Sequence, residues 1–289
     1  MAPPSLSIAA PAKLNLYLHV VGKRADGYHQ LDSLVAFAAV HDTVHLAPAE
    51  SLSLSIEGPF AEGLSSGPDN LVMRAAELLR AKAGITSGAA MRLVKRLPVA
   101  SGIGGGSADA AAALSGLIRL WDVRIDEAEL AELALSLGAD VPVCLNAKCV
   151  FMGGIGETLT PAPRLPEIPI VLVNPGVGVP TPAVFKARQG GLSEPAPFDT
   201  PVPDTPTLVG LLTARRNDLA AAAITLAPPI AEALAALDSQ SGCALARMSG
   251  SGATCFGLFT EATAADAAAA IKADHPDWWV VESRLGGSP

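Results

Sequence analysis

The stretch LPVASGIGGGSADAAAAL, residues 97–114, constrains the fold of this chain more than any other. Four of the five residues 102–106 are glycine, and a run of alanines follows. Glycine lets the backbone adopt a positive φ and approach a ligand closely, whereas alanine is the strongest helix former. A glycine loop that opens into a helix leaves N–H groups free at the positive end of the helix dipole, where phosphate binds well. We therefore expect residues 104–107 to surround a phosphate group, with the helix running from Ala108 onward.

Other interpretations of this loop are a helix capped by Ser107 after a tight turn, or one of two known phosphate loops. Three consecutive glycines disfavour the simple cap, because each glycine loses conformational entropy on folding. The pattern G-x-x-x-x-G-K-[ST] fails because no lysine precedes Ser107. The dinucleotide pattern G-x-G-x-x-G fits only at Gly102 and Gly104, which argues against a nicotinamide-dependent oxidoreductase.

Strand-like and helix-like segments follow one another without strict alternation, which favours an α+β fold in two lobes. The segment 68–84 is typical of a helix, with Asp69 or Asn70 as its N-cap and Gly84 at its end. The proline-rich segment 161–169 indicates the junction between a domain of residues 1–162 and one of residues 163–289. Residues 186–206 have the composition of a loop.

Composition excludes several classes of protein. Half of the 289 residues are hydrophobic and 17% are charged, so the chain can form a large core. A net charge of −8 argues against nucleic acid as a partner. The start of the chain has no signal-peptide pattern, the longest uncharged stretch is interrupted by proline and glycine, and the four cysteines form no C-x-x-C pair. We expect a cytoplasmic protein with reduced thiols and no membrane partner.

A second glycine motif, MSGSGATCFGLF, lies between two strand-like segments at residues 248–259. Its Gly250, Ser251 and Gly252 suit either a close approach of the backbone to a ligand or a tight hairpin turn.

Two charged residues are unusual for their surroundings. Lys13 lies inside an otherwise apolar strand, where it must either find a partner or extend from an edge strand to water. Asp140 follows a glycine that ends a helix and precedes Pro142, so it could cap a new helix. Asn15, two residues after Lys13, would project from the same face of the strand.

Together these motifs resemble those of the GHMP kinases. The glycine loop resembles the family's central motif, the N-terminal stretch PAKLNLYLHVVGKRADGYHQLDSLV resembles its first motif, and MSGSGATCFGLF resembles its third. LGADVPVCL and PTPAVF are further matches, typical of the member that acts on a cytidylyl methylerythritol. The resemblance implies an N-terminal lobe like ribosomal protein S5 domain 2 and a ferredoxin-like C-terminal lobe, with the active site between them.

The resemblance also implies the chemistry, which is transfer of phosphate from ATP to a small alcohol. It makes Asp140 the catalytic base, Lys13 its catalytic partner, and Asn15 a substrate-binding residue. For ATP it implies the loop together with three looser matches, namely Asn70, Lys95 and Arg96. The loop positions are Pro98, Val99, Ala100, Ser101, Gly102, Ile103, Gly104, Gly105, Gly106, Ser107 and Ala108.

For the cytosine base the resemblance implies a sandwich between Tyr28 and Phe185, with His29 bonded to the edge of the base. Thr181 and Lys186 are weaker candidates for the same pocket. From the residues alone, Tyr28 and His29 could simply belong to a polar turn, and Phe185 to the core.

Mg²⁺ is expected with ATP, and Ser107 is the one protein ligand that we expect for it. Asp109 could approach the nucleotide or the metal, or it could only favour the start of the helix. The oligomeric state could be a monomer or a homodimer. Two alternative functions remain open: another small-molecule kinase of the same family, or a nucleotide-binding protein on the same fold without catalysis.

Overall fold

The computed structural model describes residues 5–260 and 262–286, and the first half of the chain forms a mainly antiparallel sheet. Its central element is the long hairpin of β1 (Leu6–Lys23) and β2 (His29–Ala49). One half of β2 also pairs with β4 (Gly88–Val94), which pairs in parallel with β3 (Leu52–Glu57). The other half of β2 pairs with β5 (Val150–Gly154), which forms a hairpin with β6 (Thr158–Pro161).

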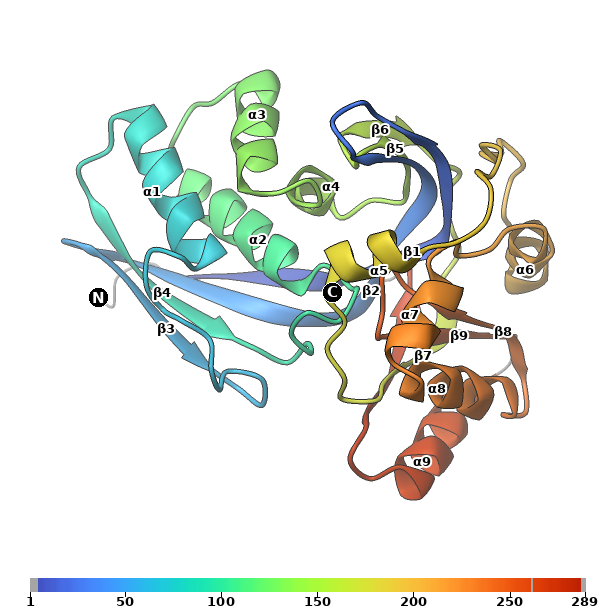
Figure 1. Cartoon of the computed structure of the whole chain (residues 1–289). Helices are drawn as coiled ribbons and strands as arrows, with labels where there is room; N and C mark the ends of the chain where they lie inside the picture. Colours follow the sequence, from blue (N-terminus) through green and yellow to red (C-terminus); the bar gives the residue numbers. More distant parts are fainter. Residues whose placement is uncertain (1–4, 261, 287–289) are drawn as a thin grey trace.

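Four helices lie together on one side of these strands (Figure 1). They are α1 (Leu71–Ala83), α2 (Gly105–Leu120), α3 (Glu127–Leu137) and α4 (Val141–Asn146). The predicted ends of α1 are confirmed, since the Asn70 side chain accepts a hydrogen bond from Val72 N and Gly84 adopts a left-handed conformation. The alanine-rich α2 lies deepest, because small side chains allow it to pack closely against β1, β2 and α1.

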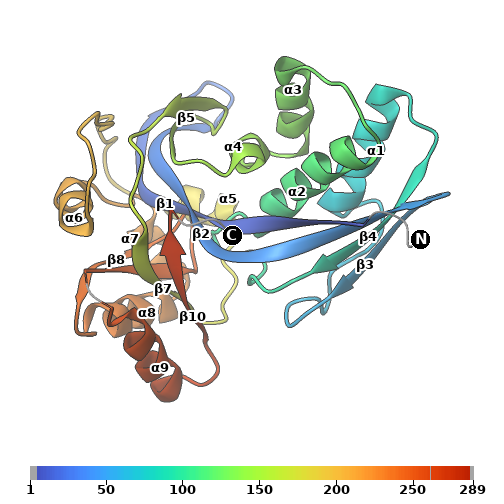
Figure 2. The same ribbon diagram turned by 180° about the vertical axis from the view of Figure 1, so that it is seen from behind.

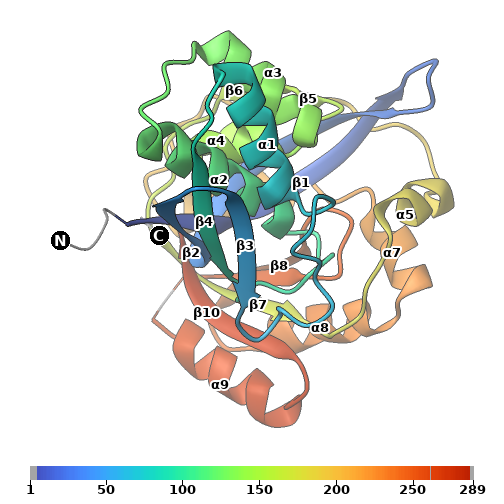
Figure 3. The same ribbon diagram turned by 90° about the vertical axis from the view of Figure 1, so that its left-hand side faces the viewer.

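The second half of the chain forms an antiparallel sheet in the order β10-β7-β9-β8. Its strands are β7 (Ile168–Asn174), β8 (Cys243–Met248), β9 (Cys255–Phe259) and β10 (Trp279–Leu285). Helices α8 (Pro229–Asp238) and α9 (Ala264–Asp274) pack on this sheet. In Figure 3 they lie on the opposite side of the strands from α1–α4. This is the expected ferredoxin-like arrangement.

Three short helices connect β7 to α8. They are α5 (Thr181–Ala187), α6 (Thr205–Thr213) and α7 (Ala220–Leu226). The prediction of a loop over residues 186–206 was wrong at both ends, because α5 continues through Ala187 and α6 begins at Thr205. Figure 1 shows α5 between the helices of the first sheet and those of the second.

A shared core joins the two halves. Along β7, Ile170 and Leu172 face a cluster with Leu14 and Leu16 of β1, whereas the alternate residues face α8 and α9. The sheets also meet through the backbone pair Leu285 and Ala38. From behind, β3 and β4 lie at one side of the molecule and β7–β10 at the other (Figure 2). The α+β fold in two lobes is as expected, and a domain boundary at residue 162 stays a prediction.

Two further findings concern the chain as a whole. No helix in the described ranges has the length and apolar character that a membrane span requires. Cys144, Cys149, Cys243 and Cys255 are all free thiols, and burial raises the pKa of each, which makes them poor nucleophiles.

Candidate active site

A cleft of about 1130 Å³ brings most of the expected site residues together. Its walls come from β1, the turn between β1 and β2, the start of α2, the residue before α4, α5, and the turn between β8 and β9. The predicted residues that line it are Lys13, Asn15, Tyr28, His29, Ala100, Ser101, Gly102, Gly104, Gly105, Gly106, Ser107, Asp140, Thr181, Phe185, Lys186, Gly250 and Ser251.

The glycine loop enters α2 earlier than expected. The helix begins at Gly105, so Gly105, Gly106 and Ser107 form its first turn and Gly104 is its N-cap. Gly104 has a φ of 64° and provides no side-chain capping bond. The first N–H groups of a helix have no partner within it, and here they face the cleft without a side chain to cap them. The interpretation of Ser107 as the cap is therefore wrong, and the helix start is left open for an anion.

The glycine loop and the third motif pack backbone against backbone. A Cβ atom on Gly102 would lie 2.6 Å from the carbonyl oxygen of Ser249, and one on Gly250 would lie 2.7 Å from that of Gly102. The Ser249 hydroxyl donates a hydrogen bond to the Gly102 carbonyl over 3.0 Å and accepts one from Asn15 N over 3.1 Å. Gly102 and Gly250 thus serve a contact between two loops, and the third motif both turns the β8–β9 hairpin and lines the cleft.

Lys13 and Asp140 form an ion pair across the cleft. The Lys13 ammonium lies 3.1 Å from Asp140 Oδ2, and the side chain of Lys13 is 4% exposed whereas that of Asp140 is 36% exposed. The interpretation of Lys13 as an edge-strand lysine reaching water is therefore wrong. Asp140 does precede α4, but it has helical backbone angles and its side chain makes no capping bond. Its carboxylate pairs with Lys13 and remains accessible from the cleft.

Asn15 fixes the position of the lysine. Its Oδ1 accepts a hydrogen bond from Lys13 Nζ over 3.1 Å, and its Nδ2 donates one to Ser33 Oγ over 2.8 Å. The Lys13 backbone N–H also donates to the Ile103 carbonyl over 2.9 Å. One strand therefore orients the lysine and holds the glycine loop at the same time.

The side chains expected at the base site gather where the β1–β2 turn meets α5. Tyr28 is 61% exposed at the turn, and Phe185 is half-buried. The ring of His29 stacks on that of Phe185, with centroids 5.0 Å apart and an angle of 19° between the planes. The Thr181 hydroxyl lies 2.8 Å from Ser251 Oγ and so connects α5 to the third motif. Phe185 presents an aromatic surface here, beside an exposed tyrosine.

Lys95 lies below the glycine loop, away from the cleft. It is 3% exposed, and it pairs with Asp42 and, over 2.7 Å, with Asp109. Burial raises the pKa of Asp109 to about 7, although the positive charge of Lys95 acts in the opposite direction. Asp109 therefore belongs to a buried network of three charges, and neither interpretation from the sequence identified this.

Several other expected ATP-binding positions do not line the cleft. Asn70 caps α1, and Arg96 bonds through Nη1 to Thr43. Ile103 and Ala108 are core residues, Pro98 is buried, and Val99 is 48% exposed at the surface. Their side chains do not form the walls of the cleft.

Four residues of this region did not stand out in the sequence. Leu71 and Lys23 line the cleft, as does Arg188, and Ser249 holds the two glycine loops together. The motif around Ser249 marked its neighbours but not the serine itself. Leu71, Lys23 and Arg188 carried no signal, because their roles depend on contacts between distant segments.

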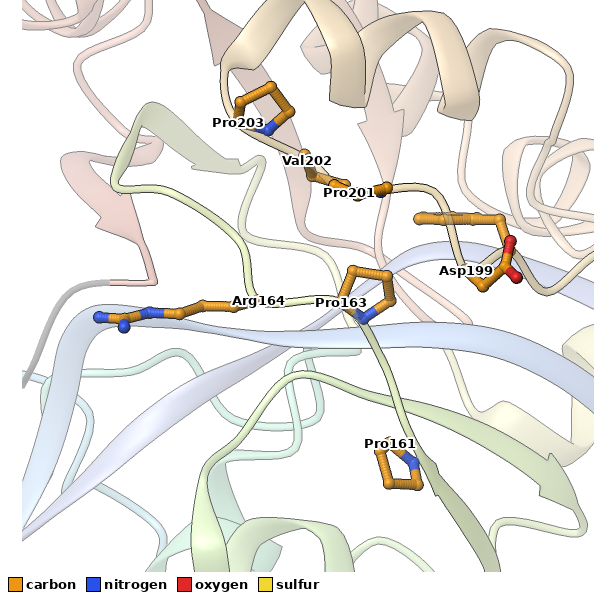
Figure 4. Close-up of a pocket in the computed structure, with 8 residues that line it drawn as sticks. Pro161, Pro163, Arg164, Asp199, Pro201, Val202 and Pro203 are labelled. Atoms are coloured by element: carbon orange, nitrogen blue, oxygen red, sulfur yellow. The ribbon is translucent and has the colours of Figure 1, made fainter.

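A smaller pocket of about 560 Å³ lies between the junction after β6 and the segment before α6 (Figure 4). It is lined by Pro161, Pro163, Arg164, Phe198, Asp199, Pro201, Val202 and Pro203. The predicted site residues line the larger cleft, so we take that cleft as the candidate active site.

Sequence comparisons show which known proteins this chain is similar to. Residues 70–148 match the model of the GHMP kinases N terminal domain, and residues 206–277 match that of the GHMP kinases C terminal. The 4-diphosphocytidyl-2-C-methyl-D-erythritol kinase of Paramagnetospirillum magneticum is 56% identical, over 97% of this chain and 99% of its own. The kinase of the same name from Rhodospirillum rubrum is 53% identical, over 99% of this chain and 94% of its own.

Structural comparisons give the same fold. A crystal structure of a 4-(cytidine 5'-diphospho)-2C-methyl-D-erythritol kinase superposes with a TM-score of 0.78 at 35% identity, over 98% of this chain and all of the other. Homoserine kinase from Cytophaga hutchinsonii has a TM-score of 0.69 at 18% identity, over 97% of this chain and 94% of its own. The second likeness is one of fold alone.

Proposed function

This chain belongs to the GHMP kinase family, and we propose that it transfers a phosphoryl group from ATP to the 2-hydroxyl of 4-diphosphocytidyl-2-C-methyl-D-erythritol. The products are the 2-phosphate and ADP, in the methylerythritol phosphate route to isoprenoids. The observation that carries the proposal is the Lys13–Asp140 ion pair, which lies in one cleft with the open start of α2 and the aromatic residues of the base site.

Asp140 is the general base in this proposal. The acceptor is a tertiary alcohol, which is a weak nucleophile while protonated, and a carboxylate that accepts its proton contributes about 10²- to 10⁴-fold in rate. The carboxylate of Asp140 is accessible from the cleft, and it pairs with Lys13, which Asn15 in turn holds in position. Lys13 also brings a positive charge to the site where phosphoryl transfer develops negative charge.

The start of α2 holds the phosphates of ATP in this proposal. Gly105, Gly106 and Ser107 offer backbone N–H groups at the positive end of a 16-residue helix. Position 104 favours glycine, because its φ is positive and a Cβ atom there would lie 3.1 Å from the side chain of Lys13. The catalytic lysine and the phosphate-binding loop are thus in direct contact.

The residues present fit a magnesium ion that arrives with the nucleotide. Within the described part of the chain, no group of three or more His, Cys, Asp or Glu side chains could hold a metal ion by itself. Mg²⁺ is commonly held by phosphates and water with one or two protein oxygens, and Ser107 in the cleft provides a hydroxyl for this purpose. When bound, the ion would offset charge on the phosphates. A cytoplasmic location and a monomeric or homodimeric state stay predictions.

Release of ADP tests the proposal directly. The full-length protein is incubated with ATP and Mg²⁺ and with each of four acceptors: the cytidylyl methylerythritol, homoserine, mevalonate and galactose. We expect turnover with the first alone. Turnover with another acceptor would assign the chain to a different activity of the family. ATP binding without any turnover would indicate a non-catalytic protein and would remove Lys13 and Asp140 from catalysis.

A further inference from the structure

Asn217 lies outside the glycine motifs and outside the walls of the cleft, yet its side chain reaches the third motif. It precedes α7 and is 7% exposed. Its Oδ1 accepts a hydrogen bond from Leu219 N over 2.9 Å. Its Nδ2 donates to the carbonyls of Met248 over 2.9 Å and Gly250 over 2.8 Å. Both N–H groups of the amide and one of its acceptor positions are used, a combination that only a carboxamide provides.

The two carbonyls that Asn217 holds lie on either side of Ser249. Ser249 is 0% exposed, and its own N–H donates to the Thr254 carbonyl over 2.9 Å. Because the peptide groups before and after Ser249 are both held, its Cα–Cβ bond has a fixed direction. The hydroxyl at the end of that bond connects Asn15 N to the Gly102 carbonyl. The amide of Asn217 thus determines where this hydroxyl lies.

The backbone around Asn217 is bonded to β1, the strand that carries Lys13. Leu18 N donates to the Arg216 carbonyl over 3.0 Å, and Asp218 N donates to the Leu18 carbonyl over 2.8 Å. Asn217 therefore takes its own position from β1. Through its amide it transmits that position to the third motif.

Two neighbouring carbonyls of the glycine loop are consequently held relative to β1. Lys13 N donates to the Ile103 carbonyl directly, over 2.9 Å. The Gly102 carbonyl is held through Ser249, which Asn217 positions. The helix α2 starts only a few residues later, so the orientation of its first turn depends on both bonds.

Phosphoryl transfer is sensitive to this orientation. The transferring phosphate must lie in line with the acceptor hydroxyl, and a displacement of about 1 Å can lower the rate about 10²-fold. We propose that Asn217, acting through Ser249, is a positioning residue that sets the glycine loop relative to Lys13 and Asp140. This inference rests on the proposed function, because it assumes that the loop holds ATP while the ion pair faces the acceptor.

Steady-state kinetics, together with calorimetric titration of ATP, test this role in the full-length protein. The variants are Asn217→Ala, Ser249→Ala and the double variant, and the control is Ser136→Ala. Ser136 lies on α3 outside the cleft, and its hydroxyl also donates to a backbone carbonyl, that of Leu133, over 2.7 Å. Urea denaturation gives the folded fraction of each variant, so that unfolded molecules are not counted as a loss in kcat.

We expect each single variant to lower kcat about 10- to 100-fold and to weaken ATP binding, with little change in the KM for the cytidylyl substrate. The aromatic base site is built from the β1–β2 turn and α5, which the lost bonds do not hold. The double variant should have a kcat close to that of the slower single variant, because both substitutions remove the same contact. Ser136→Ala should keep the wild-type kcat.

Three results would contradict this role. A wild-type kcat in both single variants, or an equal rise in the KM of both substrates, would make Asn217 and Ser249 structural residues only. Losses that multiply in the double variant would show that Asn217 does not act through Ser249. Asn217→Asp keeps an oxygen for Leu219 N but has no donor while ionised, so its kcat should fall as in Asn217→Ala. A wild-type kcat in Asn217→Asp would also overturn the inference.

The two proposals can fail separately. A wild-type protein that does not phosphorylate the cytidylyl methylerythritol would refute the proposed function, while the ATP affinities would still test the loop. Unchanged ATP affinity in both Asn217→Ala and Ser249→Ala would then overturn the positioning role. Normal turnover by the wild type and by Asn217→Ala would refute the positioning role alone.

Discussion

Replacing Lys95 with methionine should lower the free energy of unfolding, because it leaves two buried carboxylates near the glycine loop without their cation. Lys95, Asp42 and Asp109 are 3%, 0% and 3% exposed, and the lysine contacts both carboxylates. Methionine is close in length to lysine but leaves the two carboxylates side by side without a cation. Removal of one partner from a buried ion pair typically destabilises a protein by about 3–5 kcal/mol. We expect a loss of this size in the free energy of unfolding.

The loss should also depend on pH in a defined direction. In the wild type, burial raises the pKa of Asp109 to about 7, above its usual value. A raised pKa means that stability is lost as the pH rises toward the folded pKa, because the unfolded carboxyl ionises more easily. Lys95→Met removes the charge that opposes this shift, so the variant continues to lose stability above pH 7. The difference between wild type and variant should grow there by up to about 1.4 kcal/mol per pH unit.

Urea denaturation at several pH values between 5 and 9 measures both effects. Lys82→Met is a matched control, since the Lys82–Glu129 pair is about half exposed, and we expect it to leave the free energy of unfolding unchanged. Asp109→Asn in the Lys95→Met background should restore part of the lost stability and remove the pH dependence above 7. A loss in Lys95→Met no larger than that in Lys82→Met, or one that is constant from pH 6 to 9, would refute the account of this network.

Three further predictions concern the cleft. Asp140→Asn should fold and bind ATP normally but lose about 10²- to 10⁴-fold in kcat, as measured by ADP release; near-normal turnover would exclude it as the base. Phe185→Ala should raise the KM for the cytidylyl substrate by about 5- to 100-fold with little effect on that for ATP, because stacking of a base on an aromatic ring contributes about 1–3 kcal/mol. Equal effects on both substrates would make Phe185 a core residue only. Gly102→Ala should lower both Tm and ATP affinity, since its Cβ would lie 2.6 Å from the Ser249 carbonyl at a φ of 78°; a variant with wild-type ATP affinity would show that the contact between the loops does not shape the phosphate site.

The parts of the fold that depend on local signals could be predicted from the sequence. The cap at Asn70 and the turn at Gly84 act within one or two residues of the helix that they end, so the pattern alone locates them. The opening of α2 was misjudged by three residues because glycine usually argues against helix, and here it occupies the first turn. Helix α5 was missed because Pro180 and Pro182 resemble a loop, although proline is also favoured in a first helical turn.

The residues of the candidate site were harder to predict from local signals than the helix ends. The pairing of Lys13 with Asp140 was predicted only through the resemblance to a family. In the structure, Lys13 Nζ lies 3.1 Å from Asp140 Oδ2. Lys95 was misjudged because its partner Asp42 lies 53 residues earlier in the chain, and no local pattern indicates that distance. Arg188 was not identified at all, since its position in the wall of the cleft depends on its burial beside Asp218. Local sequence signals thus predict helices and strands. A buried charge whose partner lies far away in the sequence can be understood only from the tertiary structure.

The contact between the two glycine loops has a consequence for how the protein is made. Ser249, which holds the carbonyl of Gly102, lies 147 residues further along the chain. During synthesis the ribosome therefore adds Ser249 long after the glycine loop that it contacts. A nascent chain that has only its first lobe outside the ribosome contains Lys13, Asp140 and the whole glycine loop. It lacks the contact with Ser249 that holds the Gly102 carbonyl. We therefore expect a chain that ends before Ser249 to bind ATP more weakly than the full-length protein does.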